Sequence, residues 1–325
     1  MIDINVCPCT LEEGFKSFSP RAKKFFLGGK TVSYMLPYES LSSGDGLAEN
    51  KGHISLSGAQ EKYSAVIDGG VFRLTGKDER GTYILKPRLT GFDNREYGPA
   101  NENLTMQIAS QVYGIQTAEN AVCFTENGEQ VYVTKRYDVK NDGSRLQQED
   151  LASLAGITKE THGDNYKYNA LDYVGIAEII KKYIPAWRIE LVRYFDLVLF
   201  NFVFANGDAH IKNFSVLQTS RGDYRLAPAY DLINTLLHIP DGHIFALEKG
   251  LYPGWNKELG VSGSDFQVFG EMIGLDNKIV KSEIDRFCAD YPETERLIDN
   301  SFLSDKLKED YRKIFHTRIN SYLKY

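Results

Sequence analysis

The sequence predicts an α+β fold with two lobes: a small β-rich lobe over residues 1–138 and a mainly helical lobe over residues 139–325. Three observations lead to this prediction. Short strand patterns joined by Gly-containing turns dominate residues 53–136, the polar stretch DVKNDGSR follows, and long helical periods begin after it. A chain of 325 residues is also long enough to bury the cores of two lobes.

The first lobe is predicted to contain two hairpins, a further strand and one helix. KYSAVID and VFRLTG flank a Gly-Gly turn, YILKP forms the next strand, and AVCFT and QVYVTKR flank Asn127-Gly128. Between YILKP and AVCFT, apolar residues recur at every fourth position of PANENLTMQIASQVYG. This spacing predicts a helix that begins near Pro99, stops at Gly114 and packs one face on the sheet.

The second lobe is predicted from longer helical periods. LQQEDLASLAG and LDYVGIAEIIKKY are assigned to helices, and RIELVRYFDLVLFNFVFA is apolar on nearly all sides, which is typical of a buried helix. NFSVLQ and YRLAPAYD flank the turn TSRGD and predict a short hairpin. Residues 265–325 are assigned to amphipathic helices, and no chemical signature is found from residue 245 onward.

Charge and hydropathy exclude several classes of protein. A net charge of −6 argues against broad electrostatic binding to nucleic acid, and the mildly basic PRAKKFFLGGK is interpreted as a solvated face. The longest apolar stretch, Phe195–Ala205, is too short to span a bilayer, so no membrane association is expected. The N-terminus lacks the pattern of a secretory signal, which predicts a cytoplasmic location.

Four cysteines are too few and too scattered for a disulfide framework. Cys7 and Cys9 could offer two metal ligands, but no nearby Cys or His pair completes a tetrahedral site. Reduced thiols are therefore expected. His210 lacks a partner histidine at helical spacing, so an orienting or phosphate-contacting role is predicted for it in place of zinc binding.

NGDAHIKNF, residues 206–214, carries the spacing that points most directly to chemistry. Phosphoryl transfer needs a cradle for phosphates, cations that spread charge, and oxygen ligands for magnesium. Protein kinases use a loop Asp for the hydroxyl proton, an Asn five residues later for metal, and a second Asp downstream for metal. Asp208 and Asn213 have this spacing, and Asp231 in APAYDL occupies the downstream position.

The first lobe supplies matching cationic and glycine-containing segments. Lys86 in YILKP lies on a predicted strand, from which a lysine can reach phosphates. SLSGAQEK, residues 55–62, places small residues and Lys62 where backbone N–H groups could approach a phosphate. LGGKT and LTGKD fail the complete phosphate-loop pattern. Taken singly, each segment has an ordinary explanation as a cap, turn or solvated lysine; their order along the chain favours phosphoryl transfer.

These residues resemble the HipA-type kinase toxins. ISLSGAQEK, YILKP, ANENLTMQIA, TKRYD, RLQQEDLASLAG, NGDAHIKNFSV and YRLAPAYDL match that family in order and spacing over roughly residues 50–240. The resemblance implies a two-lobed protein-kinase-like fold and ATP-dependent phosphorylation of protein serine or threonine. It also implies an aminoacyl-tRNA synthetase as the class of target and a HipB-like DNA-binding antitoxin as partner.

The resemblance further implies a role for each matching residue. Asp208 becomes the catalytic base, Asn213 and Asp231 become ligands of Mg²⁺, and Lys86 neutralises the phosphates of ATP. Glu102 is expected to pair with Lys86, as the helix glutamate does in kinases. The remaining positions implied to contact ATP are Ser57, Gly58, Ala59, Gln60, Glu61 and Lys62 in the phosphate loop, Lys135, Arg136 and Tyr137 between the lobes, and His210, Ile211, Lys212 and Tyr230.

Two further expectations follow from the shorter HipT-type members of the family. Ser55 and Ser57 match loop serines that undergo autophosphorylation, and the added charge of a phosphoserine beside ATP phosphates is expected to inhibit. Only about fifty residues precede the phosphate loop, which is too few for the N-terminal subdomain of full-length HipA. A separate small HipS-like protein is therefore expected to supply the missing piece.

Two other functions remain open at this stage. The same core could serve a small-molecule or lipid kinase, since substrate recognition need not accompany ATP chemistry. A pseudokinase scaffold that only binds ATP or partners is disfavoured, because Lys86, Asp208, Asn213 and Asp231 are all present.

Overall fold

The computed structural model describes residues 2–42, 60–140, 142–240, 242–289 and 291–324. The chain packs into two compact units. Unit 1 consists of Met1–Tyr137, Leu237–Pro240 and Tyr291–Arg312; unit 2 consists of Asp138–Leu236, Asp241–Asp290 and Lys313–Tyr325. The chain therefore leaves unit 1 after Tyr137 and returns to it twice.

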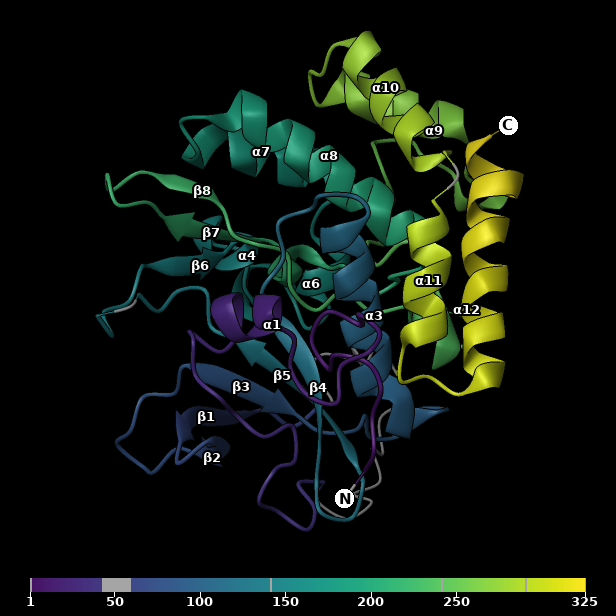
Figure 1. Cartoon of the computed structure of the whole chain (residues 1–325). Helices are drawn as coiled ribbons and strands as arrows, with labels where there is room; N and C mark the ends of the chain where they lie inside the picture. Colours follow the sequence, from purple (N-terminus) through teal and green to yellow (C-terminus); the bar gives the residue numbers. More distant parts are fainter. Residues whose placement is uncertain (1, 43–59, 141, 241, 290, 325) are drawn as a thin grey trace. The chain divides into compact units, whose positions relative to one another are not determined.

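Within the described residues, a five-stranded antiparallel sheet forms the frame of unit 1, in the order β2-β1-β3-β5-β4 (Figure 1). Its strands are β1 Tyr63–Asp68, β2 Val71–Leu74, β3 Tyr83–Lys86, β4 Asn120–Phe124 and β5 Gln130–Lys135. The predicted hairpins are confirmed, because β1 pairs with β2 and β4 pairs with β5. Gly69 and Gly70 turn the first hairpin with φ of 57° and 79°, a conformation that favours glycine.

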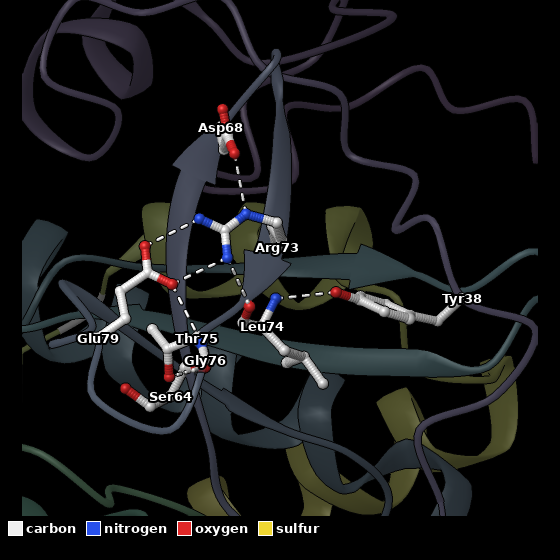
Figure 2. Close-up of polar contacts among 8 residues, drawn as sticks. All are labelled: Tyr38, Ser64, Asp68, Arg73, Leu74, Thr75, Gly76 and Glu79. Atoms are coloured by element: carbon white, nitrogen blue, oxygen red, sulfur yellow. Dashed lines mark hydrogen bonds and ion pairs between the residues drawn. The ribbon is translucent and has the colours of Figure 1, made fainter.

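Arg73 on the edge strand β2 orders the turn that leads to β3 (Figure 2). Its guanidinium donates to Asp68 Oδ2 at 2.9 Å and to both carboxylate oxygens of Glu79 at 2.8 and 2.9 Å. The backbone N–H of Gly76 also donates to Glu79, at 3.1 Å. The hydrogen bonds from Arg73 and Gly76 lower the pKa of Glu79 to about 2. Because these charges are exposed to water, the network fixes the turn more than it stabilises the fold.

The N-terminal segment, residues 2–42, covers one face of this sheet. Helix α1, Pro20–Phe25, is followed by Phe26, whose ring centroid lies 5.5 Å from that of Tyr83 and 6.0 Å from that of Phe72. The basic residue Lys24 is exposed, as predicted for PRAKKFFLGGK, but Phe26 and the residue after it are buried in the core. This segment therefore belongs to the core of unit 1 and is more than a solvated face.

The same segment covers the outer edge of β4. The N–H of Leu36 donates to the carbonyl of Phe124 at 2.7 Å, and the N–H of Phe124 donates to the carbonyl of Tyr34 at 2.9 Å. At the opposite edge of the sheet, the hydroxyl of Tyr38 accepts from the N–H of Leu74 at 2.8 Å (Figure 2). Unpaired edges invite association with other strands, so these contacts protect the sheet.

Helix α3, Gly98–Gln111, begins near Pro99 and ends before Gly114, as predicted. The helix packs one face on the sheet, as predicted, and it is buried on all other sides as well from Gly98 to Ala109. It packs against β4 and β5 and against α11, Pro292–Asn300, which belongs to unit 1. Its buried polar side chains are tolerated because they have polar partners. The short 3₁₀ helix η1, Arg95–Tyr97, leads into it.

Among the described residues of unit 2, a small antiparallel sheet has the order β6-β7-β8, with strands Gln148–Asp150, Ser215–Gln218 and Tyr224–Leu226. The predicted β7–β8 hairpin is confirmed. The helix predicted over LQQEDLASLAG is largely wrong, because residues 148–150 pair with β7 and only α4, Leu151–Leu154, is helical. Asp150 explains the boundary: its backbone is extended and its side chain caps α4 by accepting from Ser153 N–H at 2.9 Å.

Helix α8, Trp187–Val203, packs against α7, Tyr173–Tyr183, and α10, Asn277–Phe287, in unit 2 (Figure 1). Its C-terminal half is buried throughout from Val198 to Val203, which confirms the predicted core helix. Helix α7 confirms the prediction for LDYVGIAEIIKKY. The other elements of this region are α5 Lys159–His162, α6 Tyr166–Asn169, η2 Ile211–Asn213, η3 Thr235–Leu237, η4 Lys257–Leu259 and α9 Gly263–Met272.

The C-terminal region is helical, as predicted. After α11 the chain forms α12, Asp305–Arg318, and a π-helical turn η5, Ile319–Leu323. Cys7 and Cys9 are buried in the apolar core of unit 1, where burial raises the pKa of the Cys9 thiol. In the part of the chain that the structure describes, no helix has the length and apolar character needed to cross a membrane.

Candidate active site

Unit 1 holds a buried lysine–glutamate pair. Lys86, the last residue of β3, places Nζ 2.6 Å from Oε1 of Glu102 in α3, and the two side chains are only 5% and 4% exposed. The ammonium also lies 5.1 Å from the ring centroid of Tyr132 on β5. Alternation along β3 directs Leu85 to the opposite face, into the core beneath the N-terminal segment. The expected pairing of Lys86 with Glu102 is therefore confirmed.

The predicted phosphate loop is described only at its end. Ser55, Ser57, Gly58 and Ala59 lie outside the described residues. Gln60 is buried and donates from Nε2 to the carbonyl of Pro87 at 2.6 Å, which ties the loop's end to the residue after Lys86.

The next two residues of that loop differ in their surroundings. Glu61 accepts a hydrogen bond from the Tyr63 hydroxyl at 3.0 Å. Lys62 is exposed. Of the two, Lys62 therefore presents its side chain to solvent.

Residues 135–137, predicted to contact ATP between the lobes, end the first of the three segments that form unit 1. The N–H of Lys135 donates to the carbonyl of Glu119 at 2.8 Å, and that of Arg136 donates to the carbonyl of Thr82 at 2.9 Å. The Lys135 side chain donates to the carbonyl of Phe25 at 2.8 Å, and its burial lowers its pKa. These two N–H groups and the Lys135 amine are thus engaged within unit 1.

In unit 2, the loop of residues 205–214 follows helix α8 and contains the Asp208–Asn213 spacing. Ala205 has φ of 53°, a strained conformation for alanine. Thr235 holds this turn, because its N–H and its hydroxyl both donate to the Ala205 carbonyl at 2.9 Å. The N–H of Gly207 in turn donates to the Thr235 hydroxyl oxygen at 3.0 Å. Backbone strain maintained by surrounding contacts is common at functional sites.

Asp208 is 7% exposed and is held from several directions. Its N–H donates to Asn206 Oδ1 at 3.3 Å, and its carbonyl accepts from Asn213 Nδ2 at 3.0 Å. Its carboxylate accepts a hydrogen bond from the hydroxyl of Tyr168 in α6 at 3.2 Å. Tyr168 could not be singled out from the sequence, because nothing in the stretch NYKYNALDY separates it from its neighbouring tyrosines.

His210 and Ile211 are both buried in this loop. Burial lowers the pKa of His210 to about 4, so the imidazole is neutral at pH 7. Among the described residues, its Nδ1 has no hydrogen-bond partner. A neutral imidazole with an unused nitrogen in such a loop has the chemistry to contact a polar ligand, whereas the Ile211 side chain is a core group.

Asn213 and Asp231 offer oxygen atoms suited to magnesium. Because Nδ2 of Asn213 donates to Asp208, Oδ1 is the atom of this amide that can bind a cation. Asp231 has φ of 55°, the left-handed conformation that aspartate tolerates better than most residues. Amide and carboxylate oxygens, completed by phosphate oxygens and water, are the ligands that Mg²⁺ uses in kinases, so these residues fit that ion.

Tyr230 links the two predicted metal-binding segments. Its hydroxyl donates to the carbonyl of Lys212 at 2.8 Å and lies 2.6 Å from the hydroxyl of Ser215. The residue before Asp231 is therefore bonded to the residue before Asn213. The hydroxyl thus joins these segments, and a contact of this residue with nucleotide stays a prediction.

Lys212, another predicted nucleotide contact, has a carboxylate partner. Its ammonium lies 2.7 Å from Oδ2 of Asp150, the residue that caps α4. Burial alone would raise the pKa of Asp150, but hydrogen bonds from Lys212 and Ser153 leave it below its usual value. The structure thus brings Asp208, His210, Asn213, Tyr230 and Asp231 together in unit 2, with Lys212 turned toward Asp150.

Comparison with known proteins identifies the family. The model of the HipA-like C-terminal domain matches residues 54–294. A Haemophilus influenzae protein named "Putative kinase" is 27% identical over an alignment of 335 positions, which covers 94% of this chain and 94% of that protein. "Putative kinase Y4mE" of Sinorhizobium fredii is 31% identical over 195 residues, which is 58% of this chain and 44% of that protein.

A solved structure has the same fold. A chain of the Shewanella oneidensis MR-1 toxin–antitoxin complex of HipA, HipB and operator DNA matches with a TM-score of 0.67 at 18% identity. The match covers 84% of this chain and 66% of that chain, so this protein spans slightly less than two thirds of its length. The chain therefore belongs to the HipA-like C-terminal domain family and has the α+β, HipA-type kinase fold.

Proposed function

We propose that this chain is an ATP-dependent serine/threonine protein kinase. The observation that carries the proposal is the buried Lys86–Glu102 pair at 2.6 Å, because an ordinary strand lysine would be solvated. In protein kinases, a strand lysine paired with a helix glutamate positions the phosphates of ATP. Membership of a family whose relatives are named kinases supports the same conclusion.

Each polar group then has a distinct role. Asp208 accepts the proton of the attacking hydroxyl, and Lys86 neutralises phosphate charge. Asn213 Oδ1 and the Asp231 carboxylate would hold Mg²⁺, which neutralises charge that develops on the phosphate oxygens. His210, neutral at pH 7, contacts the nucleotide without adding charge.

The acceptor is proposed to be a serine or threonine of a cytoplasmic protein. The resemblance to HipA toxins makes an aminoacyl-tRNA synthetase the target class, with Ser55 or Ser57 as autophosphorylation sites. The solved HipA relative is described in a complex with HipB and operator DNA, which supports a HipB-like antitoxin as partner here. A small HipS-like protein completes the proposed toxin–antitoxin system, and direct nucleic-acid binding is not part of the proposal.

The test is transfer of label from γ-labelled ATP with Mg²⁺, using the chain and a lysate depleted of nucleotides. We expect label on protein and at least a ~100-fold loss with Asp208→Asn, since general-base catalysis contributes about 10²–10⁴. Asp164→Asn is the matched control, because Asp164 lies in unit 2 and its side chain is 77% exposed.

Label recovered only in lipid or small-molecule fractions would instead favour a small-molecule or lipid kinase. Growth inhibition that is unchanged by Asp208→Asn would favour a scaffold. Either result contradicts the proposed function.

A further inference from the structure

We propose that Tyr168 is the positioning residue for the Asp208 carboxylate; this deepens the proposed function and depends on it. Its hydroxyl donates to Asp208 Oδ1 at 3.2 Å. Both residues are buried, with 8% and 7% exposure, so water competes little for this contact. Tyr168 comes from α6, which is separate in sequence from the loop that it contacts.

Contacts to both the backbone and the ring of Tyr168 hold this residue in place. Its carbonyl accepts from the N–H of Glu248 at 2.9 Å, and Lys249 donates to the neighbouring carbonyl of Ala170 at 2.9 Å. Its ring packs edge-on against the imidazole of His210, with centroids 5.3 Å apart. A side chain restrained at its backbone and its ring presents its hydroxyl in one direction.

Hydrogen bonds from neighbouring residues fix the backbone of Asp208, whereas the Tyr168 hydroxyl acts on its side chain. The N–H and the carbonyl of Asp208 are fixed by Asn206 and Asn213. These backbone bonds do not set the side-chain torsions χ1 and χ2, and terminal torsions such as χ2 of aspartate have broad distributions. A hydrogen bond to one oxygen narrows rotation about χ2. The orientation of the base toward an acceptor hydroxyl is a geometric requirement of catalysis.

The structure offers a matched control on the same loop. The hydroxyl of Tyr173 in α7 donates to the backbone carbonyl of Ala209 at 3.0 Å, and this tyrosine is also buried. Tyr168→Phe and Tyr173→Phe therefore each remove one buried hydroxyl that binds this loop. The first removes a contact to a carboxylate, and the second removes a contact to the backbone.

The test measures ADP formation from MgATP for the parent and both variants, with kcat and KM for ATP determined separately. For Tyr168→Phe we expect kcat to fall about tenfold, because a hydrogen bond to a charged group is stronger than one between neutral groups. KM for ATP should stay within about twofold of the parent, because a contact that acts through the base affects the chemical step. For Tyr173→Phe we expect a lower Tm with kcat within about threefold. Equal kcat in Tyr168→Phe and parent, or equal falls in kcat for both variants, would overturn the assignment.

A second measurement does not depend on turnover. The Tm loss caused by Tyr168→Phe should be smaller in an Asp208→Ala background, because the acceptor is already gone. Additive losses would refute the contact. If the parent bound no MgATP and formed no ADP, the proposed function and this inference would both fail; an active parent with an unaffected Tyr168→Phe variant would overturn only this inference.

Discussion

Replacement of Glu102 by glutamine should destabilise unit 1 strongly, although the volume of the side chain hardly changes. The Lys86 ammonium is 5% exposed and would lose its carboxylate partner at 2.6 Å. Removing one partner of a buried ion pair costs about 3–5 kcal/mol, because the other charge stays buried. With about 2–4 °C per kcal/mol for a unit of this size, Tm should fall by roughly 6–20 °C.

The assay is thermal unfolding of the parent, Glu102→Gln, and the double variant Lys86→Met with Glu102→Leu. The double variant should recover most of the lost Tm, since apolar replacement of a buried pair is often neutral or stabilising. Asp164→Asn is the control: Lys159 and Asp164 are also 2.6 Å apart, but they are 71% and 77% exposed. It should leave Tm unchanged. A Glu102→Gln variant within about 2 °C of the parent would refute the reasoning, since that loss is well below the value for a buried pair.

Two other predictions test the loop of residues 205–214 and the segment Leu237–Pro240, which returns to unit 1. Gly207→Ala should lower both Tm and the rate of phosphate transfer, because a Cβ at this position would lie 2.6 Å from the carbonyl oxygen of His243. Gly76→Ala is the control. Its Cβ would have no neighbouring atom within 4 Å, so this variant should match the parent in Tm and in rate. Burial lowers the pKa of His238, although the hydrogen bond with the Asp93 carbonyl opposes this shift. The unfolded chain therefore takes up a proton at this residue more readily than the folded chain does. The contribution of neutral His238 to stability is full above about pH 6.5 and is lost as the pH falls below that value. The Tm difference between parent and His238→Asn should therefore shrink from pH 8 to pH 5, and a constant difference would contradict this assignment.

The strands of unit 1 could be predicted because their signals are local. A Gly-Gly turn and Asn127-Gly128 each sit between alternating apolar runs, and the hairpins form at those turns. The failure at residues 148–150 has a non-local cause. These residues pair with β7, which lies more than sixty positions later in the chain, and no helical period reveals that partner.

The spacing of apolar residues could not predict the surroundings of α3 either. The polar residues of this helix are buried against partners from distant segments. Asn101 lies 2.9 Å from the imidazole of His238, and Thr105 lies 3.0 Å from the hydroxyl of Tyr311. Both partners belong to segments that return to unit 1 after the chain has built much of unit 2. Only the tertiary structure shows that such residues pair.

The residues of the candidate site also fall into those that the sequence predicts and those that it does not. Lys86, Asp208, Asn213 and Asp231 could be proposed from the sequence because phosphoryl transfer requires residues of this type, order and spacing. The groups that hold them could not. Tyr168 is one of 20 tyrosines in the chain, and its contact with Asp208 is set by the placement of α6. A hydroxyl that supports another side chain has no spacing rule, so sequence patterns do not predict it.

The contacts that order Lys86 lie within unit 1, and those that order Asp208, Asn213 and Asp231 lie within unit 2. In unit 1, the partner of Lys86 comes from a helix that is buried on all sides, so the ammonium is oriented before any nucleotide binds. In unit 2, Tyr230 joins the segments of Asn213 and Asp231, and Thr235 holds the strained turn before Asp208. Groups ordered in advance lose little conformational entropy when a ligand arrives. If the proposed function holds, nucleotide affinity should therefore depend on these contacts within each unit as well as on the residues that touch ATP.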